Sequence, residues 1–229
     1  MEETVKRKGQ MLIRSAMAVF VFIIAGSYLP LRSQDWEAEG QKKADALIKK
    51  NGSGTELKLQ KRLLEMKEED QAIRHKAFNA PVDKVKENEL FKDMEAVDRK
   101  LTAELKEIVQ KYSWPTIRLV GMQASQAATL ILNHSPDHDF QRELLPKLSK
   151  MVEQDEIVGS DLGPIIDKLL LSEGKPQLLG SVFRFEGEFM IMEPVEDPEH
   201  LDQRRAQYLL PPMKEYIKTM EDIYHKKVK

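Results

Sequence analysis

Hydrophobic residues in the middle of the chain recur at steps of three and four, the spacing of one face of an α-helix. After a loop predicted at 51–55, one such stripe contains Leu59, Leu63, Met66 and Ile73. A longer stripe runs from Leu90 to Tyr112, and charged residues fill the opposite face of each segment. Both segments therefore predict amphipathic helices that pack on an apolar core.

The remainder of the chain continues this helical pattern and then changes. Residues 121–133 are small and apolar, which predicts the most buried helix, and another stripe lies between Phe140 and Val152. Short apolar runs flank Gly187 and predict a β-hairpin over 183–192, followed by a final amphipathic helix near Tyr216. The predicted fold class is mainly α (α+β), a single helical domain with a small antiparallel β-hairpin or sheet near the C-terminus.

The N-terminus carries a targeting pattern. Four basic residues within positions 1–14 precede seventeen uncharged residues, Ser15 to Leu31. This order is typical of a secretory signal or of an uncleaved anchor. A seventeen-residue helix spans about 25 Å, short of a hydrocarbon core of about 30 Å. Gly26, Ser27 and Pro30 further favour a cleavage site nearby, whereas a buried helix of a cytosolic domain would need an apolar partner that the sequence does not show.

Three segments follow from these patterns. Residues 1–33 are a signal peptide or membrane anchor, 34–56 a polar helical or linker segment, and 57–229 a globular domain. Because the basic flank stays inside, the rest of the chain is expected to be exported to the periplasm or cell envelope. If the segment is not cleaved, residues 15–31 would anchor the protein in the inner membrane.

Composition excludes several functions. The 229 residues have a formal net charge of −2 and no cysteine. Disulfides, thiolate nucleophiles and cysteine metal sites are therefore excluded, and the charge predicts no nucleic-acid partner. Nucleotide-binding glycine motifs, the GxSxG motif and clusters at metal-ligand spacing are also missing from the sequence, so we expect neither cofactor nor metal.

Asp70 is the most informative anomaly, because it continues the apolar stripe of Leu63 and Met66. A buried carboxylate is costly unless it is paired, and Arg74 lies one helical turn further on. The pair is either a structural ion pair or part of a cleft in which Arg74 binds an anion. His134 ends the predicted buried helix, where it either caps the helix or acts as a general base or ligand.

Three further polar residues are candidates for the site. Adjacent helical residues point about 100° apart, so one of Arg204 and Arg205 should turn inward, toward Asp70 or Asp167. Gln177 follows Pro176 in a short predicted strand, where it contacts either a sheet edge or a ligand.

These residues belong to an ordered series of short motifs. The series is Asp70–Gln71–x–x–Arg74, Trp114–Pro115–Thr116, Ala124–Ser125–x–Ala127–Ala128, His134, Gly174–Lys175–Pro176–Gln177–Leu178, Arg204–Arg205–Ala206 and Leu210–Pro211–Pro212. Over about 57–220 it resembles a bacterial domain family of unknown function. The resemblance implies a set of functional polar positions: Asp70, Gln71, Arg74, His134, Asp167, Gln177, and Arg204 or Arg205.

This chain departs from the family pattern at several positions. Asn133 stands where Gln precedes the histidine, and Lys168 stands where Arg follows Asp167. Leu179 replaces a Tyr, Ser181–Val182 replaces Thr-Gln, and Leu209 replaces a Gly.

Two functions are consistent with the sequence. The first is an exported or membrane-anchored binding module for a peptide, glycan or protein partner, with Gln71, Arg74, Asp167, Gln177, Arg204 and Arg205 as ligand contacts. The alternative is a hydrolase-type or lyase-type enzyme that uses His134 as general base, Asp70 to orient it and an arginine to hold an anionic group. Convergence of His134, Asp70 and an arginine in an open site would favour the enzyme.

Overall fold

The computed structural model describes residues 35–79 and 84–229. The signal or anchor predicted for residues 1–33 lies outside them. Within the described ranges, no helix has both the length and the apolar character to cross a membrane. The predicted fold class is confirmed: most of the described chain is helical, and a small sheet lies near the C-terminus.

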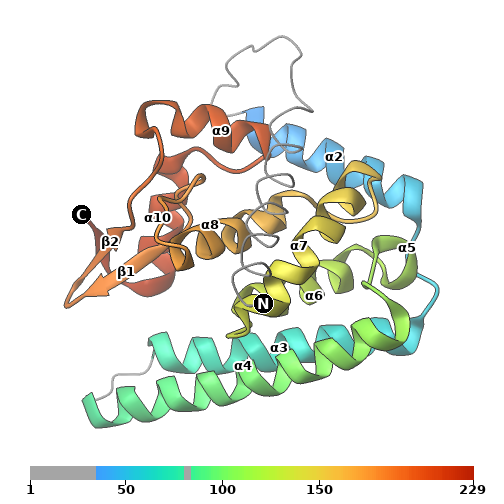
Figure 1. The fold of residues 1–229 in the computed structure, drawn as a ribbon, viewed down its shortest axis with the longest axis horizontal. Coiled ribbons are helices and arrows are strands. Elements are labelled where there is room, and N and C mark those ends of the chain that lie inside the picture. The colour runs from blue at the N-terminus through green and yellow to red at the C-terminus, as the bar shows by residue number, and fades with distance from the viewer. Residues whose placement is uncertain (1–34, 80–83) are drawn as a thin grey trace, which may run out of the picture.

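Two long helices form one side of the molecule. α3 (Leu57–Asn79) and α4 (Lys84–Tyr112) run antiparallel and pack along each other, as Figure 1 shows. Their apolar stripes are buried together, with Leu63, Met66 and Leu105 fully enclosed. The prediction of two amphipathic helices is therefore confirmed.

α6 (Met122–His134) packs across this pair and forms the centre of the core. Ala124, Ala127 and Ala128 on this helix are all buried. Their small side chains let α3 and α4 approach the helix closely. Because α6 ends at His134, it delivers that side chain to the surface of the α3–α4 pair.

The loop predicted at 51–55 packs against the junction of α5 (Ile117–Val120) and α6. A Cβ atom on Gly54 would lie 2.6 Å from the backbone nitrogen of Gly121, and both glycines have positive φ angles of 98° and 78°. The two chain segments can meet only without side chains at these positions. This contact joins the start of α3 to the start of α6.

Further helices cover the other side of α6. α7 (His138–Glu153) and α8 (Gly163–Ser172) follow it in the chain, with the short helix η1 (Ser160–Leu162) between them. α2 (Asp35–Asn51) lies on the outside of the bundle, where Lys43 and Lys50 form ion pairs with Asp155. The segment 34–56 therefore contains a helix that packs on the domain.

The C-terminal part contains the sheet. The predicted hairpin is confirmed: β1 (Phe183–Glu186) and β2 (Phe189–Met192) are antiparallel. The sequence did not indicate β3 (Lys227–Val228), which pairs with β2 in parallel and makes a three-stranded mixed sheet. Along the chain, β2 and β3 are separated by η2 (Pro198–His200), α9 (Leu201–Gln207) and α10 (Met213–Tyr224).

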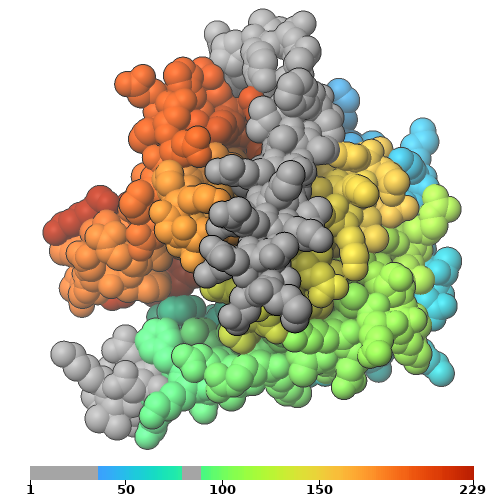
Figure 2. Space-filling model, in the orientation of Figure 1, coloured from blue at the N-terminus to red at the C-terminus, as the bar shows by residue number. Residues whose placement is uncertain are grey.

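Aromatic rings connect this C-terminal part to the ends of the long helices. Phe78 of α3 lies 4.7 Å from Tyr224 of α10 and 6.4 Å from Phe185 of β1, measured between ring centroids. Phe91 of α4 completes the group at 6.1 Å from Phe78. In Figure 2 the hairpin lies at one end of the molecule, beside the ends of α3 and α4. The aromatic contacts hold it there.

Candidate functional site

Asp70 is the centre of a buried polar cluster. It lies on the core-facing side of α3 and is 1% exposed, as its place in the apolar stripe predicted. Its Oδ1 atom lies 2.8 Å from Nδ1 of His134 and 2.9 Å from a guanidinium nitrogen of Arg74. Nε2 of Gln71 donates to its Oδ2 atom at 2.7 Å. Both carboxylate oxygens are therefore satisfied by neighbouring side chains.

His134 enters the cluster from the end of α6, and 18% of its side chain is exposed. Since an ionised carboxylate only accepts hydrogen bonds, the contact with Asp70 places the ring proton on Nδ1. Nε2 then carries the free lone pair. Among the residues that the structure describes, the hydrogen bond of this ring is the one at Nδ1.

The pKa values in this pair agree with a neutral imidazole beside an ionised carboxylate. Burial lowers the pKa of His134 below 6.5, and its bond to Asp70 only partly opposes that effect. Burial tends to raise the pKa of Asp70, but the hydrogen bond from His134 and the charge of Arg74 lower it overall. At neutral pH the pair therefore holds one negative charge on Asp70 and an unprotonated Nε2.

Arg74 lies between two carboxylates. Besides Asp70, it contacts both oxygens of Asp98 on α4, at 2.9 and 3.0 Å. One terminal nitrogen of the guanidinium thus binds Asp98 while the other binds Asp70, so the arginine is engaged by residues of the protein itself. Of the two interpretations of Arg74, the structure shows an internal ion pair. Burial raises the pKa of Asp98, and the charge of Arg74 counteracts that shift.

Lys168 supplies a second positive charge. It belongs to α8, and its Nζ donates to the backbone oxygen of Asn133 at 2.7 Å, directly beside His134. Burial, together with the charge of Arg74, lowers the pKa of Lys168 to about 8. Its ammonium group has three hydrogens, so the bond to Asn133 leaves donors for a ligand.

Asp98 and Lys168 were not among the residues predicted for the site. Asp98 carried a signal, because it lies four residues after Met94 and three before Leu101 on the apolar stripe of α4. Lys168 was noted only as a departure from an arginine. In the fold it keeps a cation beside His134 but lacks the planar fork of arginine.

The other predicted ligand contacts form a second polar cluster. Asp167 is fully buried on α8, and its carboxylate accepts from the backbone nitrogens of Leu178, Leu179 and Ser181. The Ser181 hydroxyl also donates to it, at 2.7 Å. Ser181 therefore supplies a side-chain hydroxyl to this buried carboxylate. Asp167 holds the chain around 178–181 against α8.

Gln177 is likewise used within the protein. Its side-chain amide donates to the backbone oxygens of Val182 and Glu193, and its Oε1 accepts from the nitrogen of Val182. Of its two interpretations, the structure shows the contact with neighbouring strand-like segments.

The arginine pair behaves as the helical geometry predicted, but its partners differ. Arg205 turns inward and is 1% exposed, while Arg204 is less buried. The predicted acidic partner of the inward arginine, Asp70 or Asp167, is wrong. The Arg205 guanidinium donates to the backbone oxygens of Leu179 and Pro211 and lies against the Tyr216 ring. Backbone oxygens replace the expected carboxylate because the segment containing Leu179 and the segment after α9, at Pro211, both lie against this side chain.

The predicted residues therefore separate into two places. Asp70, Gln71, Arg74 and His134 come together with Asp98 and Lys168, and we call this group the His134 centre. Asp167, Gln177, Arg204 and Arg205 organise the segment 177–182. In the described chain, no group of three or more acidic or histidine side chains is arranged to hold a metal ion.

Comparison with known proteins adds a family. The model of a family of unknown function matches residues 57–229. This range begins at the start of α3 and includes both polar clusters. Neither a curated protein nor a solved structure gives a significant match.

We expect Asp70→Ala to lower the free energy of unfolding by about 3 kcal/mol, because it removes the buried carboxylate that Arg74, His134 and Gln71 share and leaves the Arg74 charge with one partner fewer. Urea denaturation monitored by circular dichroism would measure the loss. Asp93→Ala, on the exposed face of α4, is the matched control and should cost under about 0.5 kcal/mol. Equal stability of the two variants would contradict a structural requirement for the Asp70 charge.

Proposed function

The chain belongs to the DUF6624 family, a family of unknown function, over residues 57–229, and we propose that it is an acid–base enzyme of the hydrolase or lyase type. The observation that supports this most directly is the 2.8 Å contact between His134 Nδ1 and a carboxylate oxygen of Asp70. A histidine held in this way presents Nε2 as a proton acceptor, which is the arrangement that general-base catalysis requires.

His134 is the general base in this proposal, and Asp70 orients it. Removing a proton from water or substrate turns the imidazole into an imidazolium, and the buried carboxylate stabilises that charge. A lowered pKa keeps His134 unprotonated before the reaction. The His134 side chain is 18% exposed and Asp70 is 1% exposed, so in this proposal the reactant approaches the imidazole and does not contact the carboxylate.

Lys168 is the partner acid. With a pKa of about 8 it is protonated at neutral pH yet able to release its proton. An acid and a base whose pKa values are shifted by their surroundings in this way can act as a pair in one reaction. In hydrolysis, Nε2 would take a proton from water as the water oxygen attacks the electrophilic carbon, and Lys168 would protonate the departing oxygen or nitrogen. In a lyase, the same two groups would remove a carbon-bound proton and protonate the leaving group.

Arg74 and Asp98 are positioning residues. The arginine contacts Asp70 and Asp98 at the same time, so it holds the Asp70 carboxylate in the orientation that faces His134. Its positive charge also helps to keep Asp70 ionised. The sequence left open whether Arg74 binds an anion in a cleft. Its internal pairing leaves that task to other cations.

A non-enzymatic module for a peptide, glycan or protein partner is the second candidate. It is favoured over an enzyme by the 1% exposure of Asp70 and the internal pairing of Arg74, because both groups are satisfied without a substrate. Arg74 is then not one of the ligand contacts of such a module. The enzyme would turn over a substrate and need His134 to do so, whereas the module would bind its partner without any reaction.

We expect hydrolysis of at least one class in a panel of p-nitrophenyl esters, phosphates and glycosides. His134→Gln should lower kcat/KM by about 1,000-fold, because general-base catalysis contributes roughly that much. His200→Gln is the matched control. Its Nδ1 also lies 2.8 Å from an aspartate, Asp197, but on an exposed surface outside the centre.

The control should keep full activity. Equal activity of the two histidine variants, or no turnover of any class by the wild-type chain, would contradict the hydrolytic proposal. Binding of a partner without turnover would then support the second candidate.

The pH dependence gives a separate check on the two roles. A base must be unprotonated, so kcat/KM should fall as pH decreases through the lowered pKa of His134, below 6.5. An acid must be protonated, so activity should also fall as pH rises through about 8, the pKa of Lys168. We expect a bell-shaped profile, and Lys168→Met should remove its alkaline limb. A variant with lower activity but an unchanged alkaline limb would contradict the assignment of Lys168.

We also propose that residues 1–33 direct the protein out of the cytoplasm. The support is the order of basic residues followed by an apolar run in the sequence. An alkaline phosphatase reporter fused after Ser33 should be active in the periplasm of a bacterial host. Val21→Arg, which places a charge inside the apolar run, should abolish that activity. Equal reporter activity in both fusions would contradict export, and the mass of the exported chain would distinguish cleavage from anchoring.

A further inference from the structure

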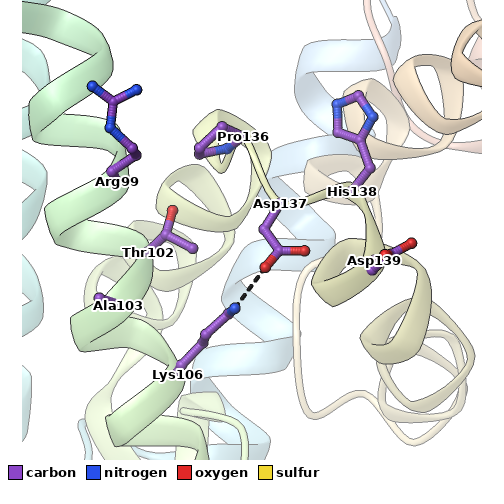
Figure 3. A pocket seen from close by; sticks show the side chains of 8 residues that line it. All are labelled: Arg99, Thr102, Ala103, Lys106, Pro136, Asp137, His138 and Asp139. Atoms are coloured by element: carbon purple, nitrogen blue, oxygen red, sulfur yellow. Dashed lines mark hydrogen bonds and ion pairs between the residues drawn. The ribbon is translucent and has the colours of Figure 1, made fainter.

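A groove of about 550 Å³ lies between α4 and the turn that joins α6 to α7. Arg99, Thr102 and Lys106 line it from α4, and Pro136, Asp137 and His138 line it from the turn. Figure 3 shows these two walls facing each other. We call it the α4 groove.

The α4 groove adjoins the His134 centre through both of its walls. Thr102 lies one helical turn after Asp98, the residue that binds Arg74. Pro136 lies two residues after His134 in the chain. A ligand in the groove would therefore lie along the same helix and the same turn that build the centre.

Thr102 has an unused hydrogen-bonding group at the groove. The residue is 5% exposed, and its hydroxyl has no partner among the described residues. A threonine hydroxyl within a helix can bond to the backbone oxygen four residues earlier, and this one does not. Figure 3 shows the hydroxyl pointing into the space between Arg99 and Pro136. A buried hydroxyl without a hydrogen bond is energetically unfavourable, so a polar ligand that bonds to it would bind with a more favourable free energy.

The charged residues of the groove are unequally engaged. Asp137 already accepts from Lys106 at 2.6 Å and from the backbone nitrogen of Phe140 at 2.9 Å. Asp139 at the rim accepts from Arg142 at 2.5 Å. Asp137 is thus paired within the protein, whereas the Asp139 side chain remains 95% exposed at the rim.

The basic groups keep donors for a ligand. The guanidinium of Arg99 is 61% exposed, and it contacts the similarly exposed Glu95 at 3.4 Å. Its remaining N–H groups, and two hydrogens of the Lys106 ammonium, are not used by that contact or by Asp137. On the α4 wall the groove therefore offers hydrogen-bond donors from Arg99, Thr102 and Lys106, which match an acceptor-rich anion.

We propose that the α4 groove binds an anionic group, a carboxylate or a phosphate, of the molecule on which the His134 centre acts. Arg99 and Lys106 provide the charge, and the Thr102 hydroxyl donates the buried hydrogen bond. The binding site stands on the groove alone, while its role as a substrate subsite rests on the proposed function.

The test uses the purified full-length chain. Its melting temperature is measured against increasing inorganic phosphate in one series and glutarate in another, each at constant ionic strength set with sodium chloride. Binding to the folded state raises the melting temperature with ligand concentration and gives an apparent Kd. A response to only one of the anions identifies the chemical group.

Two variants separate binding from folding. Arg99→Gln and Thr102→Val should each weaken the apparent Kd by about tenfold, the equivalent of one charge-assisted hydrogen bond. Thr102→Val removes a hydroxyl without a partner in the described chain, so its melting temperature without ligand should not fall. Arg118→Gln, an exposed arginine on α5, is the control and should bind like the wild-type chain.

His134→Gln distinguishes this proposal from the catalytic one. It should keep anion binding while losing turnover, whereas Arg99→Gln should raise KM for an anionic substrate and leave kcat nearly unchanged. No stabilisation by either anion beyond that of sodium chloride would overturn the groove proposal. Equal weakening by Arg99→Gln and Arg118→Gln would also overturn it, because it would show nonspecific attraction to surface charge.

Discussion

The buried carboxylate of Asp70 is the constraint on which the rest of the structure depends. A charge that is 1% exposed is tolerated only with close partners, and here the partners come from different helices. Arg74 belongs to the same helix, His134 to the end of α6, and Asp98, through Arg74, to α4. The need to satisfy one carboxylate therefore fixes how three helices meet. It also leaves one imidazole nitrogen without a described partner at the edge of the cluster.

α8 connects this centre to the C-terminal part of the protein. Asp167 and Lys168 are neighbours on that helix, so their side chains point in different directions. Asp167 binds the backbone of 178–181, while Lys168 reaches the end of α6 beside His134. The same helix therefore holds the segment before the hairpin and places a cation at the centre. Substitutions around 177–182 should be felt at Lys168 through α8, although the two polar clusters are separate.

Two positions at which the sequence departs from the motifs expected from the resemblance make specific contacts in this fold. The Ser181 hydroxyl binds Asp167, a contact that the Thr expected there from the resemblance would also make. Lys168 keeps the positive charge but has a compact ammonium group whose pKa burial lowers to about 8, which an arginine would not show. This chain therefore has a titratable cation beside His134, and an arginine at this position would carry a permanent one.

Periodicity in the sequence determined the helices, the hairpin and the inward direction of Asp70, because burial of one face imposes a repeat on the residues. It also determined which of the polar residues are exceptional, since a charge on an apolar stripe is visible without coordinates. Only the tertiary structure decided which exceptional residues share a site. Asp70 and His134 are 64 positions apart and meet, whereas Arg205 and Asp167 both turn inward and bind backbone instead of each other. Hydrogen bonds between distant segments depend on how the helices cross and how the turns fold back, and no local repeat records that geometry.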